Sequence, residues 1–252
     1  MRAIPQKIMI LKFIGEQGIV TVSDVTRHLF EDEKFSCVRV IMHQLGIAHM
    51  KFREIPNGVW FIDNPELYKQ LSLYFPDFLR FEVRSVVMHH IDHDLELNRI
   101  RTSFTRTHLI TIDQWWSEKY IRALPIYLRR DFRIKFPDAI FWRKRHDGTS
   151  QKYFLEYERT MKSKERYENI FRSYVTNKEV KDRNVIYICA DIHIKEELHN
   201  IEQNLVKSGR LGQGGEYFQF ITLEGFYKTH SNNLIQKGEM IYEKNQTAYA
   251  NV

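Results

Sequence analysis

The sequence predicts a mixed α/β protein built from two parts. In residues 6–75, apolar residues recur at helical spacing in three short runs and then alternate along one hairpin. From residue 82 onward a long helical pattern, a second hairpin and further helix and strand patterns follow, which is typical of an α/β core with a mixed sheet. At 252 residues the chain is long enough for two domains, which we place at 1–75 and 76–252.

The composition favours a globular protein with a polyanionic partner. The chain has 38 Lys and Arg against 32 Asp and Glu, a net charge of +6, which suits nucleic acid. Cys37 and Cys189 give no disulfide framework and no zinc spacing, so a reducing cytoplasm fits best. No apolar run approaches the ~18 residues of a membrane span. The N-terminus lacks a signal-peptide cleavage pattern, and we expect no membrane insertion.

Three helices are expected at the start of the chain. The first spans about residues 5–18, with Ile8, Leu11, Phe13 and Ile14 on one face and a Gly-containing turn at its end. The second spans residues 21–30, begins with a Thr or Ser cap and places Val22, Val25 and Leu29 inward. The third spans residues 36–46, with Ser36 as its cap, Val38, Ile41 and Leu45 inward, and Arg39, Met42 and His43 outward.

A hairpin is expected over residues 48–63, with the turn at Pro56-Asn57-Gly58. Three helices followed by a hairpin is the order of a winged helix, whose third helix enters the major groove while its wing touches phosphates. The DNA-contacting candidates are Arg39, His43, Gln44, Lys51 and Arg53. Alternatively, the module packs against another protein or caps the neighbouring domain. Residues 64–81, with two prolines, are expected to be the linker.

A long helix is expected over residues 82–104. Val83, Val87, Ile91 and Leu95 define its apolar stripe, and Asp94 and Asn98 fall inside that stripe. A buried carboxylate is costly unless it is paired, hydrogen-bonded or bound to metal, so Asp94 is a candidate functional residue; a salt bridge to a basic neighbour is the alternative.

His89, His90 and His93 cluster on the same helix. His90 and His93 are spaced as metal-ligating pairs can be. However, the HExxH pattern is missing, which favours a hydrogen-bonded histidine.

Two strands are expected at residues 138–145 and 152–159, joined by a turn at Asp147-Gly148. Asp138 begins the first strand, and Glu156 and Glu158 share a face of the second because side chains alternate. Three carboxylates in one place suit Mg²⁺ or Mn²⁺, which prefer oxygen ligands. The alternative is a pair of solvent-facing charges on an edge strand.

The remaining pattern completes an α/β core. We expect an amphipathic helix at residues 163–178 with Tyr167, Ile170, Phe171 and Tyr174 inward, a buried strand at 184–191, a helix at 194–209 and a closing strand at 216–226.

The segments "PDAIF" (137–141) and "EYERT" (156–160) resemble the proline-aspartate, glutamate-x-lysine nuclease superfamily. Together with "HDLELNRIR" (93–101) and the expected winged helix, the chain resembles the replication-relaxation family, specifically the MOB-C class of plasmid relaxases. The resemblance covers essentially the whole chain. It implies a restriction-endonuclease-like core that uses a divalent metal to nick one strand of plasmid DNA at a transfer origin, with possible accessory mobilisation and coupling proteins as partners.

The resemblance also implies roles for individual residues. Asp138 and Glu156 match the motif acids, and His93 and Asn98 match the upstream His and Asn of the family. Glu158 stands where the general pattern has lysine, which leaves the general base open; Lys162 and Lys164 are possible substitutes, and Arg159 is another although it cannot act as a base. The nucleophile is also open between water and a tyrosine such as Tyr167 or Tyr174. The rival hypothesis is a non-catalytic DNA-binding replication or regulatory protein with a decayed nuclease fold.

Overall fold

The computed structural model describes residues 4–30, 34–53, 55–76, 88–107, 115–125, 135–144, 148–178, 180, 184–211 and 217–229. The chain divides into two compact units. The N-terminal unit comprises Met1–Thr102 and Trp115–Ile140, and the C-terminal unit comprises Ser103–Gln114 and Phe141–Val252. This division differs from the boundary expected near residue 75. The protein is a mixed α/β protein, as predicted.

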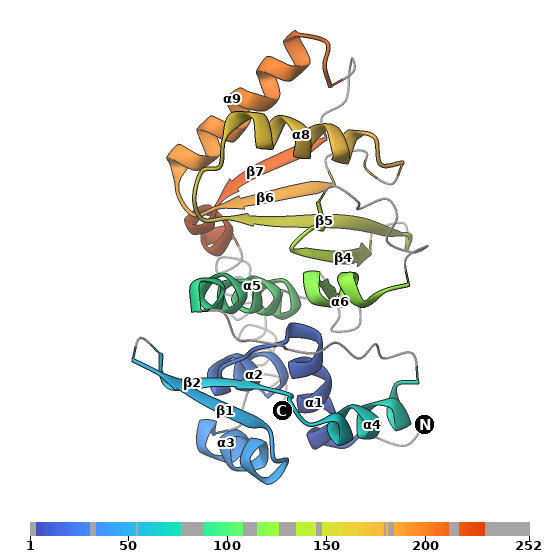
Figure 1. The fold of residues 1–252 in the computed structure, drawn as a ribbon, viewed down its shortest axis with the longest axis vertical. Coiled ribbons are helices and arrows are strands. Elements are labelled where there is room, and N and C mark those ends of the chain that lie inside the picture. Colours follow the sequence, from blue (N-terminus) through green and yellow to red (C-terminus); the bar gives the residue numbers. More distant parts are fainter. Residues whose placement is uncertain are drawn as a thin grey trace, which may run out of the picture. The chain divides into compact units, whose positions relative to one another are not determined.

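The N-terminal unit begins with three helices and a hairpin, in the predicted order (Figure 1). These elements are α1 (Gln6–Gln17), α2 (Val22–Leu29), α3 (Phe35–Gln44), β1 (Ala48–Phe52) and β2 (Ile55–Phe61). α1 ends at Gly18, whose φ of 84° suits glycine. α2 begins with a capping box in which the side chains of Thr21 and Asp24 each accept a backbone N–H bond from the other.

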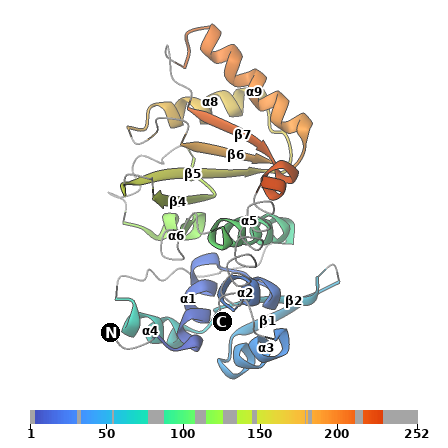
Figure 2. The ribbon, with the colours of Figure 1, turned by 180° about the vertical axis from the view of Figure 1, so that it is seen from behind.

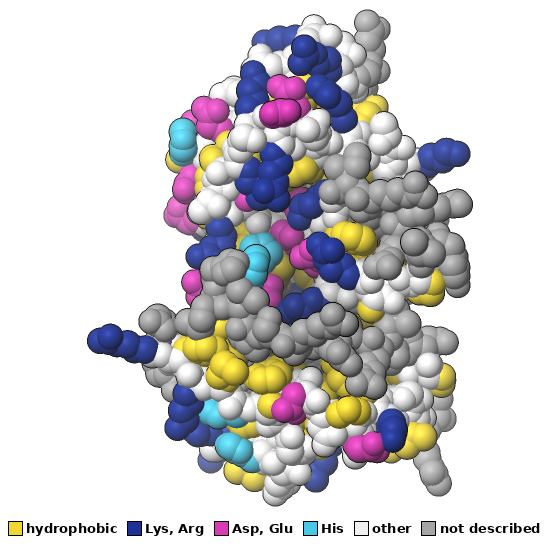
Figure 3. Space-filling model, viewed as in Figure 1, with side chains coloured by type: hydrophobic (Ala, Val, Ile, Leu, Met, Phe, Trp, Pro, Cys, Tyr) yellow, Lys and Arg dark blue, Asp and Glu magenta, His cyan; other side chains and the backbone are white. Residues whose placement is uncertain are grey.

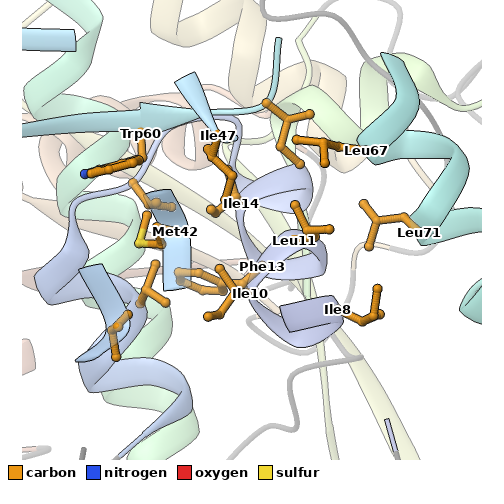
Figure 4. Packing of buried hydrophobic residues seen from close by; sticks show 14 of the residues in the cluster. Ile8, Ile10, Leu11, Phe13, Ile14, Met42, Ile47, Trp60, Leu67 and Leu71 are labelled. Atoms are coloured by element: carbon orange, nitrogen blue, oxygen red, sulfur yellow. The ribbon is translucent and has the colours of Figure 1, made fainter. Parts of the chain in front are cut away.

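These elements enclose one apolar core (Figure 4). The predicted inward residues Ile8, Leu11, Phe13 and Ile14 of α1 are all buried. Burying an aliphatic or aromatic side chain of this size contributes about 1.5–3 kcal/mol. Val20, between α1 and α2, forms an isolated antiparallel bridge to Trp60 of β2, so the hairpin is tied to the start of the helical layer.

The prediction that residues 65–74 belong to a linker is wrong, because these residues form the helix α4 (Pro65–Tyr74). Asn64 caps the helix by accepting the Glu66 N–H, and proline is tolerated in the first turn. Leu67 and Leu71 are buried in the core described above. Pro65 therefore starts a helix rather than interrupting the structure.

Two details of α3 differ from expectation. Lys34 occupies the N-cap and Ser36 lies inside the helix, so the predicted cap is wrong. Met42 is wholly buried rather than outward, because the inward stripe runs through Val38 and Met42 while Ile41 lies at its margin.

The predicted position of the hairpin turn is also wrong. Residues 56–58 lie within β2, and the strands meet at the pair Phe52↔Ile55. The register shifts between Met50 and Phe52 because β2 carries an irregularity at Gly58, whose φ is 64°. A Cβ at Gly58 would lie 2.5 Å from the Met50 carbonyl oxygen, which explains the glycine.

α5 (Met88–Arg106), β3 (Trp115–Ser117) and α6 (Glu118–Ala123) follow. The stripe residues Ile91 and Leu95 of α5 are buried as predicted, whereas Val83 and Val87 lie outside the described residues. Arg101 of α5 is fully buried and donates to Glu16 of α1 at 2.7 Å, and Glu16 also pairs with Lys12. This buried ion network ties α5 to α1.

The C-terminal unit contains β5 (Ser150–Glu158), α8 (Lys164–Val175), β6 (Val185–Cys189), α9 (Ile192–Lys207) and β7 (Phe218–Thr222), after β4 (Ala139–Lys144), which crosses from one unit to the other. The hydrogen-bonded strand order is β3-β4-β5-β6-β7. β5, β6 and β7 are parallel, and Figures 1 and 2 show α8 and α9 on the same side of them. Successive right-handed crossovers in one direction produce this arrangement.

Most expected elements of this unit are confirmed. Tyr167, Ile170, Phe171 and Tyr174 of α8 are buried, and β6 is buried throughout. The expected closing strand ends earlier, because residues 223–229 are helical. Asp147 of the expected turn lies outside the described residues, while Gly148 has a φ of 82°. None of the described helices combines the length and apolar character that crossing a bilayer requires.

Candidate functional site

The outer face of α3 carries three of the predicted DNA-contacting residues. Arg39, His43 and Gln44 are exposed, and Val38 and Met42 form the buried side of the same helix. Residues 34–53 contain no Asp or Glu, although the acidic residues 31–33, which lie outside the described part, precede them. Figure 3 shows Lys, Arg and His side chains over α3 and the hairpin. This face therefore suits a polyanion.

The hairpin carries the other two predicted DNA-contacting residues. Lys51 of β1 and Arg53, which follows β1, are exposed. At the base of the hairpin, the His49 ring stacks on Trp60 with centroids 4.4 Å apart, and the His43 ring meets Trp60 edge-on at 4.6 Å. Trp60 is fully buried, so it holds the His43 ring in a defined position beside the hairpin.

A second group of predicted residues meets inside the N-terminal unit. Asp94 accepts from Lys119 of α6 at 2.6 Å, which is the salt bridge to a basic neighbour weighed above. His93 lies with Nε2 3.3 Å from Asp138 Oδ2 and with Nδ1 3.6 Å from Asp94 Oδ1. Lys135 reaches Asp138 at 3.3 Å. A small pocket lies here; its lining residues are Gln17, Asp94, Leu97, Trp115, Ser117, Glu118, Lys119 and Asp138.

The charges in this group set the protonation state of His93. Burial alone lowers the pKa of His93, but hydrogen bonds to Asp138 and Asp94 and their negative charges outweigh it and raise the pKa to about 10. For Asp94, burial has the opposite effect and raises the pKa. The hydrogen bond to His93 and the charge of Lys119 outweigh burial and leave the pKa of Asp94 below its usual range. The raised pKa favours the protonated form of His93 at neutral pH, in which both ring nitrogens can donate to the neighbouring Asp138 and Asp94 carboxylates.

Asn98 has a structural contact. It is buried, and its side-chain amide donates to the Ile19 carbonyl at 2.9 Å. Ser117 Oγ donates to the Glu16 carbonyl, and Lys119 approaches the Gln17 carbonyl at 3.4 Å. These three side chains satisfy carbonyls at and just after the C-terminal end of α1, where intrahelical donors are missing.

In the C-terminal unit, Glu156 and Glu158 are buried on β5, which lies between β4 and β6. The alternative of solvent-facing charges on an edge strand is wrong, because their exposed fractions are 4% and 6%. Glu158 accepts from Lys162 Nζ through both carboxylate oxygens, and Glu156 accepts from the Tyr174 hydroxyl. The structure thus brings the predicted Lys162 to one of the two predicted glutamates.

Tyr167 holds the segment that carries Lys162. Its hydroxyl accepts the Lys162 backbone N–H at 3.2 Å, and Lys162 Nζ lies 5.6 Å from its ring centroid. Burial is the main cause that raises the pKa of Tyr167, and the Glu158 charge adds to it although the Lys162 N–H opposes it. A fully buried tyrosine with a raised pKa is a poor nucleophile.

The donor chemistry of Glu156 and Glu158 fits Mg²⁺ or Mn²⁺, since hard ions take carboxylate oxygens and are often held by one or two carboxylates plus substrate phosphate. Within the described part of the chain, no group of three or more His, Cys, Asp or Glu side chains is arranged to hold a metal ion. Asp138 belongs to the N-terminal unit and the two glutamates to the C-terminal unit. A metal shared by all three stays a prediction.

Sequence reasoning missed Lys119, Lys135 and Tyr174 as partners of the acidic residues. Lys135 lies three residues before Asp138, a spacing that offered a signal, whereas Lys119 is 25 residues from Asp94 and offered none. Comparisons with protein-family models, curated proteins and solved structures find no match to this chain.

Proposed function

We propose that this chain binds duplex DNA through a winged helix in its N-terminal unit and nicks that DNA as a metal-dependent relaxase acting at a plasmid transfer origin. The observation that carries the DNA-binding part is the exposed face of α3 and the hairpin, which bears Arg39, Lys51 and Arg53. The isolated bridge between Val20 and Trp60 joins the segment between α1 and α2 to the hairpin, which supports the winged-helix arrangement.

The observation that supports the nuclease part is the buried pair Glu156 and Glu158 on an inner strand, with Lys162 returned to Glu158. Buried carboxylates need compensating partners, and a divalent metal ion is a compatible partner alongside Lys162 and the Tyr174 hydroxyl. A bound Mg²⁺ or Mn²⁺ supplies a metal-activated water and stabilises the charge on the scissile phosphate. Lys162 fixes the carboxylate of Glu158, and Tyr174 fixes that of Glu156.

The assignment is tested with supercoiled plasmid carrying the candidate transfer origin, incubated with the full chain and Mn²⁺. We expect an open-circle product with the wild type and at least a ~100-fold slower rate with Glu156→Gln, because the substitution removes a carboxylate ligand. Glu165→Gln is the matched control, since Glu165 is an exposed glutamate on α8. A Glu156→Gln protein that is folded and nicks at the wild-type rate contradicts the nuclease assignment.

Water is the proposed nucleophile. Tyr167 is fully buried and its hydroxyl is engaged by the Lys162 N–H. If water is the nucleophile, Tyr167→Phe should still nick, and its rate should fall only to the extent that nicking depends on the position of Lys162. A denaturing gel that reveals protein attached to a DNA end, lost in Tyr167→Phe, would instead support a tyrosine nucleophile.

A non-catalytic DNA-binding protein is the second candidate. It is favoured by the fact that Glu156 and Glu158 each already have a protein donor within the C-terminal unit. This candidate predicts site-specific DNA binding by the wild type with no nicking in either Mg²⁺ or Mn²⁺, and binding that Glu156→Gln leaves unchanged.

A further inference from the structure

Val40 occupies the middle of the exposed face of α3. The residue is 53% exposed, more than the 40% of Met50 on the hairpin. At 100° per residue, Val40 lies between His43 and Gln44 and one turn from Ser36, and all three are exposed. The inward residues Val38 and Met42 lie on the opposite side. An apolar side chain therefore stands at the centre of a polar, basic face.

This position does not serve the core of the N-terminal unit. Val40 is absent from the apolar cluster that includes Val38 and Met42 and from the residues packed against it. A surface valine has low helix propensity, and threonine or glutamine would be tolerated there. Val40 is thus available for an apolar contact in a complex.

The surroundings of Val40 favour DNA over an apolar protein surface. Arg39 lies beside it, and the 20 residues from 34 to 53 carry Lys34, Lys51 and Arg53 without an acidic residue. In the major groove, the C5-methyl of thymine is the apolar group that side chains contact, whereas Arg and Gln pair with guanine and adenine edges. A valine between His43 and Gln44, with Arg39 further round the same exposed side of the helix, fits such a set of base edges.

We infer that Val40 contacts a thymine methyl group and makes the DNA site recognised by this protein dependent on thymine at one position. The inference rests on the proposed binding of duplex DNA by α3. It further specifies which base the centre of the exposed face of α3 recognises. Arg39 and Gln44 recognise the flanking base pairs.

The experiment begins with selection of bound duplexes from a random-sequence library by the full-length protein. Each thymine in the enriched site is then replaced singly by deoxyuridine, which removes the methyl group and leaves base pairing unchanged. Removing one buried methyl should weaken binding by about fourfold at the position that Val40 contacts. Binding of Val40→Ala should be weaker to the parent duplex and unaffected by deoxyuridine at that same position.

Met50→Ala is the matched control, because Met50 is an exposed apolar residue of β1. It should retain the fourfold response to deoxyuridine. The inference is overturned if the wild type is insensitive to deoxyuridine at every position, if the enriched site lacks thymine, or if Val40→Ala keeps the full response. Failure of the proposed DNA binding has a different result, in which selection enriches no sequence and the wild type does not retain duplex DNA; that result overturns both.

Discussion

Replacing His93 by glutamine should remove a pH-dependent contribution to the stability of the N-terminal unit. The folded-state pKa of His93 is about 10 against an ordinary 6.5, so folding tightens proton binding. The resulting stabilisation is fully present below about pH 6.5 and is lost as the pH rises toward about 10. The amide introduced by His93→Gln can still donate to Asp138 but does not titrate, so the variant isolates the proton.

The size of the effect follows from the shift. A displacement from 6.5 to about 10 corresponds to at most ~5 kcal/mol, at about 1.4 kcal/mol for each pKa unit. Because the His93 side chain is 22% exposed and its proton is shared with two carboxylates, we expect a decrease of ~2–3 kcal/mol between pH 7 and pH 10.

Urea unfolding followed by tryptophan fluorescence measures this decrease, since Trp60 and Trp115 are buried in the N-terminal unit. The difference between wild type and His93→Gln should shrink steadily from pH 7 to pH 10. His90→Gln, at an exposed histidine on the same helix, is the control for general effects of the substitution. If the free energies of unfolding of wild type and His93→Gln change in parallel over this pH range, Asp138 and Asp94 do not stabilise the protonated form of His93.

Three further predictions concern other residues. DNA should protect Cys37, an exposed thiol on α3, from alkylation, while the buried Cys189 stays unreactive with or without DNA; equal labelling of Cys37 in both conditions would exclude α3 from the interface. Asn98→Ala should cost about 1–3 kcal/mol in urea unfolding because the Ile19 carbonyl loses its donor, and a loss of nicking without loss of stability would assign Asn98 a chemical role instead. Gly58→Ala should destabilise the protein by more than Gly46→Ala, because both glycines have positive φ but only Gly58 has backbone within contact of an added Cβ; equal losses would contradict the packing described at Gly58.

The helices and strands whose apolar residues repeat with a clear period could be predicted from the sequence. α1 and α8 each have a stripe that is buried as expected, since local spacing and burial agree there. The hairpin turn could not be predicted, because Asn57-Gly58 has the sequence of a tight turn yet supplies the positive φ of a strand irregularity. Both structures require the same backbone conformation, so the dipeptide alone does not separate them.

The partners of the acidic residues were harder to predict. Asp94 was identified because its position in an apolar stripe demanded compensation, but the compensating Lys119 comes from a separate helix. Arg101 and Glu16 lie 85 residues apart, and neither position shows a local pattern that marks it as buried. Long-range ion pairs of this kind depend on how the helices and strands pack. The spacing of apolar residues along the sequence does not show which helices and strands pack together.

Under the proposed nuclease function, the position of Lys162 gives a physical account of Glu158, which stands where the motif expected from the sequence has a lysine. In that motif the lysine follows the glutamate by two residues on the same strand face, which is the position that Glu158 occupies here. Lys162 lies four residues after Glu158, beyond the end of β5, and the Tyr167 hydroxyl holds its backbone N–H so that its ammonium returns to the Glu158 carboxylate. An ammonium is thus placed beside the strand from the following loop. Under the proposed function, Lys162→Met should then impair nicking more than Lys164→Met, since Lys164 is exposed at the start of α8.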